Sequence, residues 1–176
     1  MKKEVGIGTI LISKPFMEDK RFEKTVILIV ENNSDGVVGF IMNKTMSNTI
    51  SVILELFPES NFNTKYGGPI DDNNRLFFIH KYPDLIKGSK EIKDGIFWGG
   101  ELTDLENGLK SGEIDENEII FFMGYTGWEQ DQLRDEIEDG SWILHHMELN
   151  KLNKNIDWSS LLIAINKEYE VWATAP

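Results

Sequence analysis

The glycine-rich segment GYTGWEQDQLRDEI, residues 124–137, is the first candidate for ligand chemistry in this chain. Its glycines separate an apolar run from a stretch with helical spacing, and free backbone amides at such a helix start attract anions. Here, however, Glu129 and Asp131 occupy the first helical turn, where their carboxylates satisfy the helix dipole and repel phosphate. The segment also lacks the lysine of a P-loop and the G-x-G-x-x-G spacing. It is therefore predicted to turn the chain and not to hold phosphate.

A structural role explains most of the same segment. Gly124 and Gly127 permit backbone angles that side chains forbid, and Trp128 is a large apolar anchor with one N–H donor. Leu133 and Ile137 are four residues apart in the predicted helix, so both face the core. The side chains left to line a pocket are those of Tyr125, Thr126 and Gln132.

Two further glycine pairs, Gly67–Gly68 and Gly99–Gly100, each follow an aromatic residue and precede acidic residues. If the three glycine turns met in space, the neighbouring carboxylates would form an oxygen-rich cation site. We favour the alternative, in which these acids cap helices or face water, so no metal site is predicted. The acids concerned are Asp71, Asp72, Glu101 and Asp104.

The histidines do not form a recognised catalytic or metal motif. His80 ends the apolar run LFFIH and is either a base or, as we favour, a hydrogen-bonded residue at the end of a strand. His145, His146 and Glu148 make H-H-x-E, which is not a known metal-ligand spacing. The chain has no G-x-S-x-G, H-E-x-x-H or Walker motif. We therefore predict no catalytic residue and no cofactor, and the interpretation leans away from an enzyme.

Length and charge limit the classes of function. The 176 residues predict one domain, 1–176, and the absence of cysteine excludes disulfides and thiolate chemistry. The net charge of −12 argues against a surface for nucleic acid or anionic membranes. No stretch approaches the roughly 18 apolar residues of a membrane span, and the N-terminus is interpreted as a first strand and not as a signal peptide. We expect a cytoplasmic protein.

The pattern of apolar residues predicts a mixture of hairpins and helices, which is typical of an α+β fold. The strongest hairpin joins 25–31 to 37–42 through Asp35–Gly36. A capping box of Thr103 and Glu106 predicts a helix that Gly112 ends. Val171 and Trp172 are expected to pack near the chain end. The other expected strands are 9–13, 76–80, 96–98 and 118–123, with 142–144 as a strand or buried turn, and the other helices are 49–57, 129–138 and 158–165.

Several motifs in this order resemble the YqgE/AlgH family of bacterial proteins. The resemblance runs from Gly8 to about Trp158 and rests on GTILISKPFMEDKRFEKTVILIVE, GVVGFIMNKT, YGGPI, RLFFIH and GYTGWEQDQLRDEI. It implies a single compact domain with a branched, partly barrel-like mixed sheet surrounded by helices. Family members are often labelled transcriptional regulators, and the family has no agreed catalytic residues. The residues of this chain that match positions of the family's motifs are Asn43, Gly67, Gly68, Arg75, His80, Gly124, Tyr125, Gly127, Trp128 and Gln132.

Three functions follow in order of preference. The first is a regulatory or interaction protein that acts through a protein partner. The second is a small-ligand-binding protein or an enzyme with a pocket near Arg75, His80 and Tyr125, where Arg75 is able to hold a carboxylate or phosphate by a bidentate fork. Direct DNA binding ranks last, and no oligomeric state is assigned. The candidate ligand-binding residues are Asn43, Tyr66, Gly67, Gly68, Arg75, His80, Tyr125, Thr126 and Gln132, with Gly124, Gly127 and Trp128 as turn residues.

Overall fold

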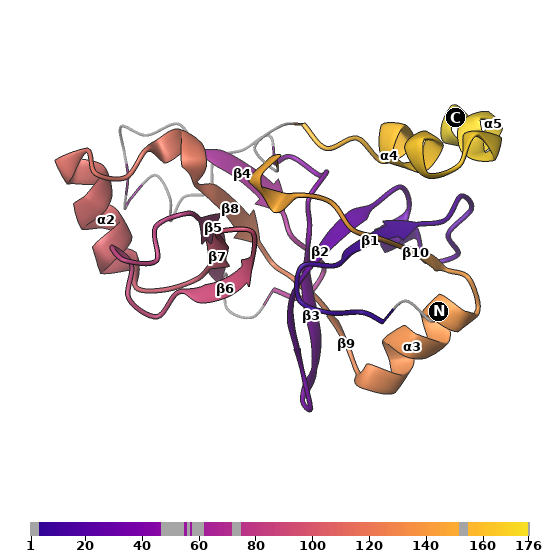
Figure 1. The fold of residues 1–176 in the computed structure, drawn as a ribbon, viewed down its shortest axis with the longest axis horizontal. Helices are drawn as coiled ribbons and strands as arrows, with labels where there is room; N and C mark the ends of the chain where they lie inside the picture. Colours follow the sequence, from indigo (N-terminus) through magenta and orange to yellow (C-terminus); the bar gives the residue numbers. More distant parts are fainter. Residues whose placement is uncertain are drawn as a thin grey trace.

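Two antiparallel-rich sheets form the framework of the protein. The computed structural model describes residues 4–46, 55, 57, 62–71, 75–151 and 155–175. Within these residues each sheet has five strands, and neither closes into a barrel. Figure 1 shows one sheet on the left beside α2 and the other on the right, with α3 below it and α4 and α5 above. The α+β fold expected from the sequence is confirmed.

The first sheet is antiparallel throughout and contains the predicted hairpin. Asn33 pairs with Gly36, so Ser34 and Asp35 make the turn. The hairpin's first strand begins with five buried residues in a row, as expected for a strand covered on both faces. In spatial order the strands are β10 (Trp142–His145), β1 (Ile10–Ser13), β2 (Val26–Asn33), β3 (Gly36–Ile41) and β9 (Thr126–Trp128).

The second sheet is mixed, because its first two strands are parallel and the remaining neighbours are antiparallel. The strands predicted at 76–80 and 96–98 are confirmed, whereas the one expected from 118 starts two residues later. A short 3-10 helix, η2 (Glu116–Glu118), occupies the preceding residues. In spatial order the strands are β4 (Asn63–Tyr66), β8 (Ile120–Met123), β5 (Leu76–His80), β7 (Ile96–Trp98) and β6 (Lys90–Lys93).

Aromatic rings fill the space between the sheets. Phe40 of the first sheet stacks on Phe122 of the second with ring centroids 4.7 Å apart, and it also contacts Phe77 and Trp98. Helix α4 (Trp158–Ile165) adds Trp158, whose indole N–H donates to the Ser13 carbonyl at 2.8 Å. The outer faces form separate cores, one with α2 (Leu102–Ser111) and one with α3 (Gln130–Glu138).

The start of helix α2 differs from the sequence interpretation. The N-cap of α2 is Glu101, so Thr103 lies inside the helix and the predicted capping box does not form; Glu106 instead accepts from the Lys110 ammonium. Gly112 ends this helix in the left-handed conformation, as predicted.

The predicted helix 49–57 lies almost entirely outside the described residues. No helix of the described part of the chain has the length and apolar character needed to cross a bilayer.

The last helix of the chain is more exposed than its apolar residues predict. Val171 and Trp172 lie on α5 (Glu170–Ala173) and are 70% and 47% exposed, so Val171 does not pack near the chain end as predicted and Trp172 packs only in part. A helix of one turn presents only one face to the protein, and Ala173 is the residue it buries. Trp172 rests its ring against Phe16, with centroids 5.1 Å apart.

The two sheets are joined where two glycine-containing segments cross. The N–H of Gly67 donates to Met123 O at 2.7 Å, and Ile70 and Tyr125 exchange two hydrogen bonds of 3.0 Å. A Cβ on Gly67 would lie 2.2 Å from Gly124 O, so the backbones approach as closely as glycine alone permits. The chain leaves the second sheet at Met123 and enters the first at Thr126. The segment predicted as a turn is therefore a crossover that continues as strand β9.

This crossing predicts an unequal response to two glycine substitutions. Gly124 and Gly95 have similar backbone angles, φ +74° and +78°, but only Gly124 is crowded, with its Cβ position 2.4 Å from Gly68 O. Gly95→Ala is expected to lower the free energy of unfolding by about 1–2 kcal/mol, the penalty of left-handed backbone. Gly124→Ala adds overpacking and is expected to lower it by about 3–5 kcal/mol. Urea denaturation measures both, and equal losses would contradict the close approach.

Candidate functional site

The predicted ligand residues are divided among several places in the fold. Gly67, Gly68, Gly124 and Tyr125 meet at the sheet crossing, whereas a Cβ on Gly100 would contact Ile86 and Lys87 in another loop. Two of the three glycine turns therefore cluster and the third does not. Asp104, one of the acids considered for a cation site, accepts from the backbone N–H of Lys87 at 3.0 Å, and Asp72 lies outside the described residues. Among the residues that the structure places, no group of three His, Asp or Glu side chains is arranged to hold a metal ion.

Two of the predicted ligand residues bind backbone groups. Asn43 accepts from Val26 N at 2.9 Å and donates to Lys24 O at 2.8 Å. Thr126 is fully buried, and its hydroxyl donates to Gly39 O at 3.0 Å. These side chains hold strands in place, so the expectation that Thr126 is free to line a pocket is wrong.

Arg75 immediately precedes β5, and His80 is the last residue of that strand. A strand rises about 3.3 Å per residue, so their Cα atoms are about 16 Å apart. The guanidinium of Arg75 lies 5.2 Å from the centre of the Phe77 ring, and that ring also contacts Tyr125. The structure therefore brings Arg75 and Tyr125 to the same ring but leaves His80 apart. Ligand binding at these residues stays a prediction.

His80 contacts Ser89 in a geometry that resembles a catalytic dyad, with Nε2 3.2 Å from the serine Oγ. The imidazole is, however, already committed to the backbone. Its Nδ1 accepts from Tyr82 N at 3.1 Å, so the proton of the neutral ring sits on Nε2 and is donated to Gly99 O at 2.9 Å. Ser89 donates its own proton to Ile86 O. Because Nε2 has no free lone pair, this histidine is not set up to take a proton from Ser89.

A polar pocket of about 320 Å³, here called the acidic pocket, lies between the segment before β2, the Pro69–Ile70 corner and one side of α3. Gln132 is the predicted ligand residue that lines it, and the turn residues Gly127 and Trp128 line it as well. The residues around it are Met17, Glu18, Asp19, Arg21, Phe22, Pro69, Ile70, Gly127, Trp128, Gln132, Glu136, Asp139 and Ser141.

Glu136 holds the floor of the acidic pocket together. Its Oε2 accepts from the indole N–H groups of Trp128 at 3.0 Å and Trp142 at 2.9 Å, and its Oε1 accepts from Gln132 at 3.3 Å. The two indoles meet edge to face at 6.0 Å, and Phe22 stacks on Trp128 at 6.4 Å. Gln132 also accepts from the N–H of Glu129, so it caps α3 as well as lining the pocket.

The acidic pocket has an excess of negative charge. Its walls carry four carboxylates but only one guanidinium, that of Arg21. Arg21 is already paired with Asp19 through bonds of 3.0 and 2.7 Å, and this pairing lowers the pKa of the Asp19 carboxyl. Asp139 accepts from both the N–H and the hydroxyl of Ser141. The site is therefore suited to a cation and not to an anion.

Sequence reasoning did not place the acidic residues of this pocket. Asp19 and Phe22 belong to the motifs that carry the family resemblance, and Glu136 belongs to the segment 124–137. These motifs indicated the family resemblance. They did not show that residues 17–22 meet α3, because more than a hundred residues of the chain separate the two segments.

Comparisons with known proteins agree with the fold. The AlgH-like family model matches residues 10–170. A UPF0301 protein of Cytophaga hutchinsonii is 33% identical over 172 residues, covering 96% of this chain and 94% of that protein. The chain is also 38% identical over 135 residues to a UPF0301 protein of Chlorobium limicola, covering 77% and 72%.

Two solved structures share the architecture. A Corynebacterium diphtheriae protein has a TM-score of 0.74 at 16% identity, covering 99% of this chain and 95% of that one. The AlgH protein of Pseudomonas aeruginosa has a TM-score of 0.71 at 23% identity, covering 100% and 99%. These likenesses establish the fold.

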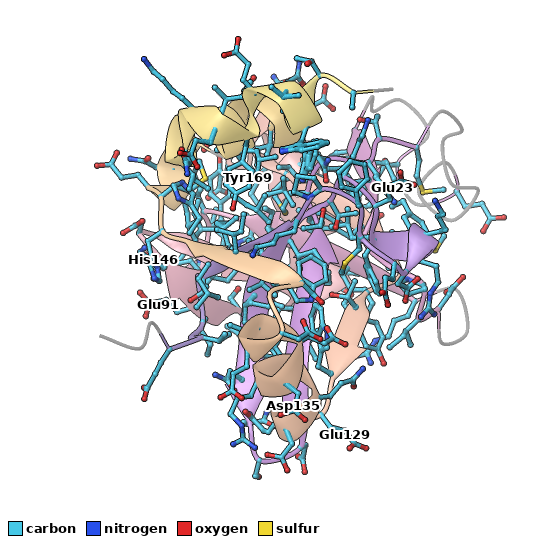
Figure 2. All side chains as sticks on the ribbon, turned by 90° about the vertical axis from the view of Figure 1, so that its right-hand side faces the viewer. Glu23, Glu91, Glu129, Asp135, His146 and Tyr169 are labelled. Carbon is cyan, nitrogen blue, oxygen red and sulfur yellow. The ribbon has the colours of Figure 1, made fainter. Side chains whose placement is uncertain are left out.

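Removing the Glu136 carboxylate is expected to destabilise the floor of the pocket. Glu136→Ala leaves two buried indole N–H groups without an acceptor and should lower the free energy of unfolding by about 2–4 kcal/mol. Asp135→Ala is the matched control, because Asp135 points away from the fold on the same helix (Figure 2) and should change stability by no more than about 0.5 kcal/mol. Thermal and urea denaturation measure both, and similar values for the two variants would contradict the role given to Glu136.

Burial gives His80 a testable pH dependence. Desolvation lowers the pKa of His80 below its ordinary value, and the bond to Gly99 opposes this only in part. Around pH 6.5 the unfolded chain therefore binds more protons than the folded protein does. The free energy of unfolding falls as pH drops from about 7 through the unfolded pKa of about 6.5. The stability difference between the wild type and His80→Gln should shrink over this range.

The control for this pH series is His146→Gln, which changes an exposed histidine (Figure 2). It shows how the loss of one histidine away from His80 affects the same pH series. A constant stability difference between the wild type and His80→Gln across this range would show that protonation of His80 does not lower the stability.

Proposed function

We propose that this chain, which belongs to the AlgH-like family, works as an interaction protein that binds a protein partner by taking a basic side chain into the acidic pocket. The observation that supports this most directly is the charge of the pocket. Four carboxylates line it, and because Asp19 is paired with the one guanidinium, three negative charges remain without a cation. A lysine or arginine side chain of a partner supplies the missing positive charge.

The pocket offers a basic side chain two kinds of interaction. Glu18 is exposed at the rim, and Asp139 carries a second carboxylate at the end of α3, so an incoming cation gains charge-assisted hydrogen bonds. Phe22 and Trp128 line the same cavity, and aromatic rings attract cations and pack against aliphatic stems. A volume of about 320 Å³ suits one side chain better than a folded segment.

The charge of the whole chain supports the same class of partner. A net charge of −12 attracts basic proteins over long distances and speeds their encounter. The same charge repels the phosphates of DNA, so direct DNA binding ranks last among the functions considered. Under this proposal any regulatory effect, including one on transcription, passes through the bound protein, and the chain acts in the cytoplasm.

The proposal predicts selective binding of a basic peptide. Acetyl-Gly-Arg-Gly-amide, titrated into the ¹⁵N-labelled protein, should shift the resonances of Gly127, Gln132 and the Trp128 indole, whereas the matching glutamyl peptide should not. The variant E18Q/D139N removes two rim charges and should weaken binding by about tenfold, since exposed charge pairs contribute up to about 1 kcal/mol each. Binding should also weaken as salt rises.

The control E91Q/D135N removes the same number and type of charges elsewhere. Glu91 lies on β6 of the second sheet, and Asp135 points outward from α3 (Figure 2). If both double variants bind the peptide equally, or if the glutamyl peptide gives the same shifts, the acidic pocket is not the binding site. In a native lysate, a true partner should be retained by the wild type and by this control and lost with E18Q/D139N.

A further inference from the structure

A second and larger cavity, of about 660 Å³, runs along the other side of α3; we call it the α3 groove. The helix contributes one stripe of residues to the groove, while Gln132, Glu136 and Asp139 face the acidic pocket. The two cavities share no lining residue and are therefore separate sites. The groove is lined by Gln130, Leu133, Arg134, Ile137 and Glu138 of α3, by Glu4, Val5, Asn32 and Val37, and by Trp142, Ile143 and Leu144 of β10.

The interior of the α3 groove is apolar. Its floor is made of Val37, Leu133 and Trp142, which are 2 to 3% exposed. Helix α3 has nine residues and is about 13 Å long, so the groove is elongated. A volume of this size falls in the usual range of about 300–1,000 Å³ for small-molecule sites.

The polar groups at one end of the groove are already paired with one another. Asn32 donates to Val5 O at 3.0 Å and accepts from Gln130 at 2.6 Å, and Gln130 also donates to Asn33 O. Because these side-chain amides are bonded to protein groups, they depend little on hydrogen bonds to water. The groove therefore favours an apolar chain along its length, because apolar surface gains most from leaving water.

The charges at the mouth of the groove decide the head group of a ligand. Glu4 and Glu138 are exposed carboxylates that line it. Arg134, the basic residue of the lining, pairs with Asp131 at 2.6 Å. A carboxylate head group would meet a like charge at either of these residues, whereas an ammonium group would be attracted.

We infer that the α3 groove binds a small amphipathic amine, a molecule with an apolar chain and one cationic head. The chain lies between α3 and the Glu4–Val5 segment, and the head lies against an exposed carboxylate of the groove lining. This site is independent of the acidic pocket and of the protein partner proposed for it. The inference rests on the size of the cavity, its apolar floor and its acidic mouth.

Octylamine and octanoate form a matched pair of probes, because they have the same chain and opposite charges. Calorimetry should give octylamine at least about tenfold higher affinity, and methyl shifts should be confined to groove residues such as Val37 and Leu133. Leu144→Trp fills the groove and should weaken octylamine at least about tenfold. Val5→Trp fills the groove from the other wall. It replaces Leu144→Trp in the test if thermal unfolding shows that Leu144→Trp is unstable.

Two charge variants separate this site from the acidic pocket. E4Q/E138Q should reduce the preference for octylamine over octanoate, whereas E18Q/D139N should leave both affinities unchanged. Equal affinity for the two probes, or shifts confined to Gly127 and the Trp128 indole, would overturn the inference. So would sedimentation of the free protein as a dimer that Leu144→Trp dissociates, because a second copy of the chain would then cover the groove.

Discussion

The close approach of two backbones at the sheet crossing fixes the rest of this structure. A Cβ on Gly68 would lie 2.2 Å from Tyr125 O, and one on Gly124 would lie 2.4 Å from Gly68 O. Glycine at these positions lets β8 leave the second sheet and continue into the first without a connecting loop. Pro69 and Ile70 follow one arm of the crossing, and Gly127 and Trp128 follow the other. Both arms therefore deliver walls of the acidic pocket, and the placement of that pocket depends on the crossing.

Glu136 gives the pocket its floor for a related reason. An indole N–H that is removed from water needs an acceptor, and one carboxylate here serves two tryptophans on different strands. Because that carboxylate stays at the base of a polar cavity, its structural bonds and its negative charge lie in the same place. Helix α3 then separates two environments, with an acidic, aromatic pocket on one side and an apolar groove on the other.

Residue type alone misleads at several positions of this fold. Asn43 and Thr126 have the polar side chains expected of a binding site, yet each is bonded to the backbone of a neighbouring strand. His80 and Ser89 lie within hydrogen-bond distance, yet the backbone N–H of Tyr82 fixes the tautomer that cannot act as a base toward the serine. In each case the nearest backbone group decides what the side chain does.

The sequence by itself determined the local structure, because hydrophobic period, turn residues and helix stops act over a few neighbours. The hairpin that turns at Ser34–Asp35, the helix end at Gly112 and the strand LFFIH all follow from such local rules. Net charge and the absence of cysteine also needed no structure. Only the tertiary structure decided which distant segments meet: that residues 17–22 face α3, that two glycine turns cluster while the third stays apart, and that Arg75 and His80 are separated. Contacts between segments far apart in the chain depend on how the two sheets cross, and no local pattern carries that information.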